Sequence, residues 1–313
     1  MSRSYTFRIT QEEAGRRLDE FLASRFGGLS RMRIGSLLAR GACRVGAGPG
    51  LPGHRLAPGD LLEFTIDEAV PSAMRPEPIP LEIIHEDGHI LVVVKPPGML
   101  VHPTKSVKSG TLANALTYHL NRDFYAGSAA PGADHEAADE ALDLVRPGLV
   151  HRLDRATSGL MVIARTPRAL SVLSRHFHRR LVEKRYLAIV RGRVPGPAGA
   201  IRAPIGRDPD RRPQWGVTES GKPSETRFQV LDRGAGATLV ELEPVTGRTN
   251  QLRIHMAHAG HPIIGDGMYG EPGPRLCLHA WRLAFHHPAG GGWVEFTSPL
   301  PRDVKEALLT SGP

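Results

Sequence analysis

The chain has 313 residues, 40% of them apolar and 23% charged, which suits one large domain and a small one with a sizeable core. Forty Lys and Arg residues against 32 Asp and Glu residues give a net charge of +8 and a pI near 9.9, so the balance favours a polyanionic partner. The composition excludes a disordered chain, and the longest apolar run, residues 90–94, is far shorter than the ~20 residues of a membrane span.

Residues 1–69 are predicted to form a small module of two helices and short strands. Apolar residues at helical spacing place the helices within residues 12–26 and 29–41, and Gly/Pro turns separate the strands that follow. Arg31 and Arg33 fall in the first turn of the second helix, where the helix dipole favours anions rather than cations. Neighbouring phosphates would explain that placement, and a solvated helix end with scattered arginines explains it equally well.

Four prolines between residues 71 and 80 predict a linker over residues 70–80, which leaves residues 81–313 as the second domain. Within this domain, residues 122–147 are rich in Ala, Gly and acidic residues and predict a solvated, flexible acidic insertion. The insertion is expected to hold no site of its own.

The second domain is predicted to be α+β with a mixed or largely antiparallel sheet, because irregular Gly/Pro-rich loops separate its strands without regular βαβ alternation. Thr166 and Pro167 suit the N-cap and the first position of a helix, and a further helix is expected to start near Thr249. The predicted strands cover residues 90–95, 159–166, 184–192, 236–245 and 293–299.

Residues 165–193 concentrate the positive charge, with nine Lys and Arg residues and one acid, Glu183. The helix in this segment can direct Arg168, Arg175 and Arg179 away from its apolar face, where phosphates could reach them. That apolar face is predicted at Leu170, Leu173, Phe177 and Leu181. An ordinary solvated helix face is the alternative, although a single acid disfavours local salt bridges.

Histidines in two segments invite a metal-site interpretation that their surroundings oppose. His85 to His89 matches the HExxH pattern of zinc proteases, but the interior Asp-Gly pair favours a turn and a buried strand follows directly. His255, His258 and His261 lie three residues apart with no Cys or carboxylate to complete a site, and we expect them on a helix surface or facing a ligand. The sequence therefore predicts no metal site.

Asp154 is the candidate catalytic carboxylate, because HRLDRATSGL places it on a loop between strands. A structural Asx turn is the competing interpretation, and the residues alone favour it. Ser158 lacks the surroundings of a nucleophile elbow and is expected to be a turn and packing residue. Arg253 lies one turn into its helix beside apolar residues and needs a carboxylate partner, for which Asp154 is attractive and an ordinary surface role is the alternative.

Taken together, five segments resemble, in order along the chain, the RluA-type pseudouridine synthases. They are VVVKPPGMLVHP, HRLDRATSGL, KRYLAIV, GRTNQLRIHMAHAGHPIIGD and LHAWRLAFHHP. Residues 16–66 resemble the αL RNA-binding module that often precedes this catalytic domain. Each segment is a weak signal alone, and five in one order are a specific one.

The resemblance implies which residues act. Asp154 would be the essential carboxylate, Tyr186 would lie against the target uracil and act in proton transfer at C5, and Arg253 would pair with Asp154. Arg152 would enter the RNA helix and help to extrude the uridine. The other expected RNA contacts are Arg31, Arg33, Arg175, Arg179, Lys184 and Arg248. Enzymes of this family use no metal and no cofactor.

The resemblance also sets the expected substrate and its rivals. The αL module favours large-subunit ribosomal RNA over transfer RNA, and the alternatives are a transfer-RNA synthase, a catalytically inactive RNA-binding or ribosome-assembly factor, and, distantly, a zinc hydrolase. Asn250 stands where the family usually has His, and the acidic insertion is longer than expected. Without a recognisable secretory signal or disulfide framework, a cytoplasmic location is expected. A monomer is the expected oligomeric state.

Overall fold

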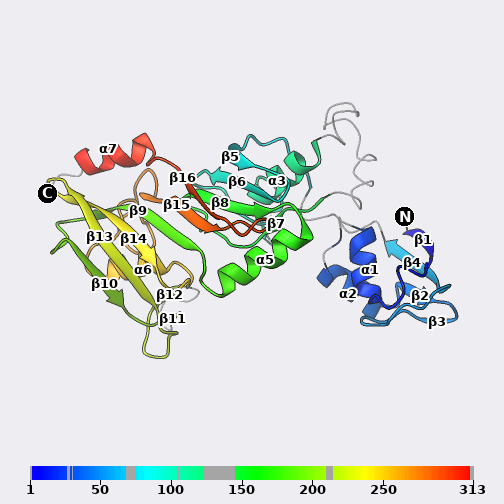
Figure 1. The fold of residues 1–313 in the computed structure, drawn as a ribbon. Coiled ribbons are helices and arrows are strands. Elements are labelled where there is room, and N and C mark those ends of the chain that lie inside the picture. Colours follow the sequence, from blue (N-terminus) through cyan, green and yellow to red (C-terminus); the bar gives the residue numbers. More distant parts are fainter. Residues whose placement is uncertain are drawn as a thin grey trace. The chain divides into compact units, whose positions relative to one another are not determined.

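The computed structural model describes residues 2–26, 29, 31–67, 75–104, 106–122, 145–208 and 214–310 (Figure 1). The chain divides into two compact units. The first comprises Met1–Ile79 with His102–Pro147, and the second comprises Pro80–Val101 with Gly148–Pro313. No helix within the described ranges has the length and apolar character that a membrane crossing needs.

The N-terminal part of the first unit contains two helices and a four-stranded antiparallel sheet with the strand order β1-β4-β2-β3. Its elements are β1 (Ser2–Arg8), α1 (Leu18–Arg25), α2 (Arg31–Ala39), β2 (Cys43–Val45), β3 (Gly48–Pro49) and β4 (Leu61–Asp67). The predicted apolar helix faces are buried, and Phe26 packs edge-on against Tyr5 and Phe7 of β1, a strand that the sequence analysis did not predict. Both predicted helices are present, in shortened form.

The described part of the predicted linker, residues 75–80, is hydrogen-bonded to the residues that begin the next helix. Helix α3 (Leu112–Leu120) begins at a capping box made by Thr111 and Asn114. The Asn114 amide donates to the carbonyl of Arg75 at 2.8 Å, and the Gly110 N–H donates to the Glu77 carboxylate at 2.9 Å. Residues 75–79 therefore belong to the structure around α3, because they satisfy its capping groups.

The acidic insertion falls almost wholly outside the described residues, at 123–144. Its two flanks are joined by one side chain: the Asn121 amide donates to the carbonyl of Val145 at 2.9 Å and accepts from the Val145 N–H at 2.7 Å. The Asn121 side chain thus bonds both the C=O and the N–H of Val145, as a neighbouring strand would, and fixes residue 145 next to the end of α3.

A ten-stranded sheet dominates the second unit, and its main path runs β10-β13-β14-β9-β15-β8-β6-β5. β7 also pairs with β8, and β16 with β15. The strands are β5 (Glu82–Glu86), β6 (Ile90–Lys95), β7 (Gly148–Leu149), β8 (Ser158–Ala164), β9 (Glu183–Arg191), β10 (Ala198–Arg202), β13 (Glu225–Arg233), β14 (Ala237–Pro244), β15 (Leu278–His286) and β16 (Trp293–Thr297). β15 and β8 run parallel, and the other strand pairs of this sheet within the described residues are antiparallel. The predicted α+β class with a largely antiparallel sheet is confirmed.

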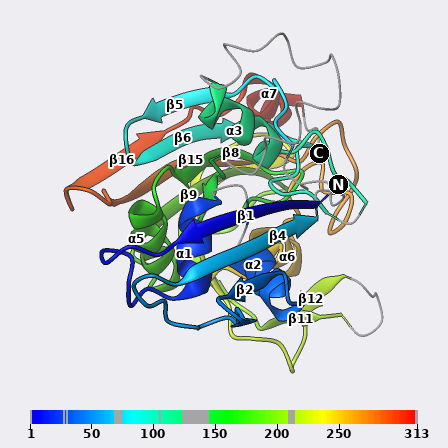
Figure 2. The same ribbon diagram turned by 90° about the vertical axis from the view of Figure 1, so that its right-hand side faces the viewer.

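Two helices cover the same face of this sheet and a third lies on the other face (Figures 1 and 2). They are α5 (Pro167–His178), α6 (Gln251–His258) and, opposite them, α7 (Arg302–Thr310). α5 begins as predicted, with Thr166 as N-cap and Pro167 in the first turn. Its buried residues are Ala169 and Leu173, while Leu170 and Leu181 are 37% and 48% exposed. The predicted apolar face therefore includes two residues that do not pack in the core.

Residues 85–89 are not helical. His85 lies in β5 and an Asp-Gly turn leads into β6, as the turn signal predicts. The Asp87 carboxylate accepts from the N–H groups of His89 and Ile90 and bonds the rings of His85 and His287. The HExxH pattern therefore encodes a strand-turn-strand connection.

Candidate active site

Asp154 lies on the loop between β7 and β8, as predicted. The N–H of Thr157 donates to the backbone carbonyl of Asp154 at 3.2 Å, and the Asp154 carboxylate makes no hydrogen bond with any described residue. The Asx-turn alternative requires that carboxylate as the acceptor, so the structure does not support it. Burial raises the pKa of the Asp154 carboxyl, while the charges of Arg253, Arg152 and Lys95 oppose that rise. A half-buried carboxylate surrounded by cations and left without a partner is suited to act on a substrate.

The Lys95 side chain holds the Asp154 loop in place, a role that was not predicted from the sequence. Its fully buried ammonium donates to the carbonyls of Pro96, Met99 and Arg155 at 2.7, 3.0 and 3.1 Å. Burial lowers the pKa of Lys95 to about 8, against the opposing charge of Asp154. Three carbonyls satisfy all three ammonium donors, so the Pro-Pro-Gly turn and the Asp154 loop are fixed to each other. The sequence does contain a sign of this role: Lys95 ends an otherwise apolar strand, and a charged side chain buried there requires hydrogen-bond partners.

Tyr186 lies in β9, paired across the sheet with Leu242 of β14 and Ala280 of β15. Burial, and then the negative charge of Asp154, raise the pKa of the Tyr186 phenol. The phenol therefore stays protonated at neutral pH, and the two predicted catalytic side chains lie within electrostatic reach of each other.

The predicted pair between Arg253 and Asp154 is wrong, because Asp266 occupies the guanidinium fork. Nε and Nη2 of Arg253 donate to the two oxygens of Asp266 at 2.7 and 2.6 Å, and the two side chains are 9% and 0% exposed. Asp266 also accepts from the N–H groups of Met268 and Tyr269, which help to orient its carboxylate toward Arg253. The charge of Arg253 still lowers the pKa of Asp154, so Arg253 acts electrostatically on both carboxylates.

Asn250, the residue before α6, suits the backbone conformation at that position. Asn250 has a left-handed φ of 54°, a conformation that Asn and His tolerate better than most residues. Its amide donates to the Tyr269 hydroxyl at 3.0 Å, and the Tyr269 ring lies 5.1 Å from the Arg253 guanidinium carbon. Asn250 therefore helps to position the aromatic ring under Arg253.

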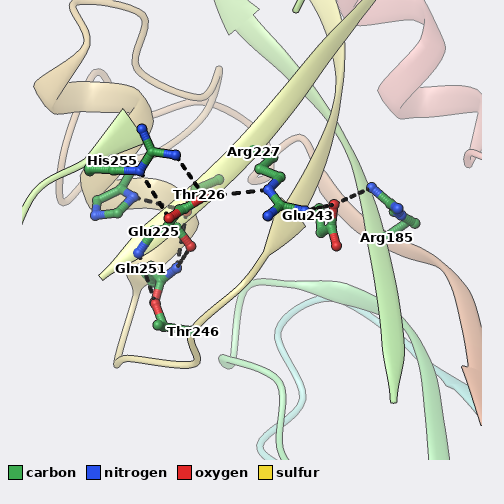
Figure 3. Close-up of polar contacts among 9 residues, drawn as sticks. Arg185, Glu225, Thr226, Arg227, Glu243, Thr246, Gln251 and His255 are labelled. Atoms are coloured by element: carbon green, nitrogen blue, oxygen red, sulfur yellow. Dashed lines mark hydrogen bonds and ion pairs between the residues drawn. The ribbon is translucent and has the colours of Figure 1, made fainter. Parts of the chain in front are cut away.

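Buried polar contacts anchor α6 to the sheet (Figure 3). The Gln251 amide donates to the carbonyl of Glu225 at 2.8 Å and to the Thr226 hydroxyl at 3.1 Å. His255 contacts the Thr226 hydroxyl at 2.9 Å and the carbonyl of Ala203 at 3.0 Å. The expectation of a surface His255 is wrong, because both ring nitrogens are engaged in the core and they fix the helix that carries Arg253.

Ser158 is a packing residue, as predicted. Its hydroxyl accepts from Nη2 of Arg275 at 2.7 Å and contacts Nδ1 of His279 at 2.9 Å. Arg275 also donates to the Asp303 carboxylate at 2.9 Å, so this network connects the Asp154 loop to α7. Burial lowers the pKa of His279 to about 4, which keeps its ring neutral at physiological pH.

The expected RNA-binding residues differ in their surroundings. Arg152 is exposed two residues before Asp154, and Lys184 is half-buried two residues before Tyr186 on β9. Arg248 precedes α6, with one amino group near the carbonyl of Pro223 and a buried Nε that has no partner among the described atoms. Arg175 and Arg179 are exposed in the last turn and C-cap of α5. Arg31 and Arg33 begin α2, and their side chains lie outside the described part of the chain.

Fewer cations of the basic segment 165–193 are available to bind RNA than its charge count predicts, because some form ion pairs within the protein. Arg165 contacts Glu86 at 3.2 Å, Arg185 contacts Glu243 at 2.7 Å, and Arg191 pairs with Glu271. These acids lie on other strands and loops, so a count along the sequence cannot include them. Six cations of the segment have no ion pair within the described ranges: Arg168, Arg175, Arg179, Arg180, Lys184 and Arg193.

The sheet face opposite α6 carries an alternating row of charges (Figure 3). Arg202 pairs with Glu225, Arg227 contacts both Glu225 and Glu243, and Arg185 contacts Glu243. Strand register places Arg227 opposite Glu243, on the face away from Thr226 and α6. Each cation in this row has an acidic partner, in contrast to the cations around α5.

Known proteins resemble this chain over most of its length. Residues 89–258, which include Asp154, Tyr186 and Arg253, match the family model described as RNA pseudouridylate synthase. The chain is 37% identical over 306 residues to an uncharacterised RNA pseudouridine synthase of Bacillus subtilis, covering 96% of this chain and 95% of that protein. It is 37% identical over 317 residues to ribosomal large subunit pseudouridine synthase D of Neisseria meningitidis, covering 96% and 80%. The solved structure of human RNA pseudouridylate synthase domain containing 1 superposes with a TM-score of 0.56 at 29% identity, covering 70% of this chain and 83% of that one.

Proposed function

Because the chain belongs to the RNA pseudouridine synthase family, whose members are isomerases, we propose that it converts specific uridines of large-subunit ribosomal RNA to pseudouridine. The observation that carries the proposal is the Asp154 carboxylate, which has no hydrogen-bond partner among the described residues while Arg253, Lys95 and Tyr186 lie within reach of its charge. The names of several relatives specify the large ribosomal subunit. The resemblance of residues 16–66 to an αL module supports the same substrate class.

The isomerisation breaks the N1–C1′ bond of uridine and forms a C5–C1′ bond, while the hydrogen on C5 is lost and N1 gains one. Uracil is a poor leaving group, so a carboxylate fixed near C1′ is required. Asp154 acts either as a nucleophile at C1′ or as the base that removes the 2′ proton to give a glycal. In both routes Arg253 favours the ionised carboxylate, and Tyr186 supplies a protonated phenol against the uracil.

The target uridine must leave its stack before Asp154 can reach the ribose. Unstacking and unpairing cost a few kcal/mol, which contacts to the flipped base and to phosphates offset. In this proposal, Tyr186 stacks against the extruded uracil and Arg152 occupies the space that the base leaves. The substrate is bound by cations and read by shape, without a metal or a cofactor.

The decisive experiment maps pseudouridines in ribosomal and transfer RNA from a strain lacking the gene, with complementation by the wild type and by Asp154→Asn. We expect specific large-subunit positions to revert to uridine, with rescue by the wild type alone. If pseudouridines were lost from transfer RNA alone, the substrate would be transfer RNA instead of large-subunit ribosomal RNA. No lost position, or rescue by the Asp154→Asn variant, would favour an inactive RNA-binding factor instead.

A further inference from the structure

Two cations beside the site, Lys184 and Arg180, lie close enough for their charges to interact and have no acidic partner within the described ranges. Lys184 lies two residues before Tyr186 on β9, so both side chains point to the same face, about 7 Å apart along the strand. Burial, and then the charge of Arg180, lower the pKa of the Lys184 ammonium. Neither side chain has an acidic partner within the described ranges, and a half-buried lysine beside an arginine is unfavourable unless an anion joins them.

The nearest candidates for neutralising this pair are already engaged or uncharged. Glu183 precedes Lys184 and therefore points to the other face of β9, where it pairs with Arg282 at 2.9 Å. His151 lies close enough for the charge of Lys184 to affect it, but its Nε2 accepts from the N–H of Val162 at 3.0 Å. Burial lowers the pKa of His151 to about 3, so its ring contributes no charge of either sign.

Arg180 is held in a backbone conformation that glycine would adopt more easily. The Leu181 N–H donates to the carbonyl of His176 and the Arg180 N–H to that of Phe177, which is the hydrogen-bond pattern of a Schellman motif ending α5. Arg180 occupies the position of that motif that is usually glycine, with a φ of 58°. An arginine at a position with strained backbone points to a function of its side chain.

We propose that Lys184 and Arg180 bind one backbone phosphate of the RNA, next to the extruded nucleotide. This inference rests on the proposed function, because it takes the polyanion that crosses Asp154 and Tyr186 to be RNA. The phosphodiester supplies the missing negative charge, with two oxygens for a guanidinium fork and an ammonium. Lys184 lies on the face of β9 that carries Tyr186, and the position of Arg180 between α5 and β9 brings its charge to the same place.

The test separates the backbone role of residue 180 from its charge. Arg180→Gly should raise the melting temperature by about 2 °C, because glycine removes the strain, and should weaken binding of a 20-nucleotide oligouridine several-fold. Lys184→Gln should weaken binding similarly. Each variant should lower the slope of log affinity against log salt, and the two changes combined should lower it by about 0.7, the value for the one phosphate that both cations contact.

Matched controls isolate the site. Arg202→Gln removes the same charge from the opposite sheet face, where Arg202 pairs with Glu225, and should leave the affinity and the salt slope unchanged. Arg180→Lys keeps a cation at the strained position and should retain most of the binding. A wild-type salt slope in both Arg180→Gly and Lys184→Gln would overturn the phosphate site.

The outcome is distinguishable from failure of the proposed function. If the variants lose binding as expected while the wild type modifies no RNA, the phosphate site stands and the enzymatic assignment falls. If the wild type forms pseudouridine and the variants bind normally, the enzymatic assignment stands and the phosphate site falls. A lower melting temperature for Arg180→Gly with unchanged binding would make Arg180 a purely structural residue.

Discussion

The buried pair of Arg253 and Asp266 yields the sharpest prediction. Its four interacting polar atoms meet at 2.6 and 2.7 Å in a nearly dry environment, so removing one partner strands a buried charge. Such a loss costs about 3–5 kcal/mol. For a chain of this size each kcal/mol corresponds to about 2–4 °C, so Asp266→Asn and Arg253→Gln should each lower the melting temperature by about 10 °C.

The two variants should shift the pH dependence of catalysis in opposite directions. Asp154 acts as a carboxylate, so the acidic limb of kcat/KM follows its pKa in the free enzyme. Arg253→Gln removes a charge that lowers this pKa, and the limb should move to higher pH. Asp266→Asn removes a charge that raises it, and the limb should move to lower pH. A purely structural pair would lower activity without this divergence.

A surface pair supplies the matched control. Arg191 and Glu271 form an ion pair with side chains 55% and 67% exposed, where solvent screens the charges, so Arg191→Gln should leave both the melting temperature and the pH profile nearly unchanged. Arg253→Lys should rescue only part of the stability, because an ammonium cannot span both oxygens of Asp266. Unchanged melting temperatures in both core variants, or limbs that shift in the same direction, would refute the reasoning.

Three further predictions follow from the same geometry. Asp154→Asn should abolish turnover, measured by a turnover assay, while RNA affinity stays near wild type. Its melting temperature at neutral pH, measured by calorimetry, should not fall. The reason is that a carboxyl whose pKa is raised in the folded state destabilises the fold increasingly as pH rises through that pKa. Lys95→Met should lower the melting temperature and turnover together, because it leaves three carbonyls without their donor; retention of full activity would contradict a role in holding the Asp154 loop. Exchanging both Arg175 and Arg179 for Glu should weaken binding across RNA sequences and flatten the salt dependence by about 0.7 for each phosphate that is no longer bound, whereas a double variant with the wild-type slope would place the RNA elsewhere.

Local chemistry in the sequence was enough to predict much of the fold. Thr166 and Pro167 begin α5 because an N-cap hydroxyl and a fixed φ act within one turn. The Asp-Gly pair after Glu86 produces a turn for the same local reason. The position of Asp154 between two strands was likewise predictable, because apolar runs flank it on both sides.

The partners of charged residues were not predictable, because they depend on which distant segments meet. Asp266 and Asp154 were both available to Arg253, and the two backbone N–H groups that orient Asp266 decided between them. Arg275 meets Ser158 across 117 residues, with no motif linking them. In the basic segment, three of the nine cations pair with acids on other elements for the same reason.

The hydrogen bonds between Asn121 and Val145 have a practical consequence for protein engineering. They hold residues 121 and 145 together although these residues are 24 positions apart in the sequence. Doubling a closed loop adds only about 0.6 kcal/mol of closure entropy. Sequence added between residues 121 and 145 should therefore cost little closure entropy while these hydrogen bonds hold, and Asn121→Ala should remove that restraint.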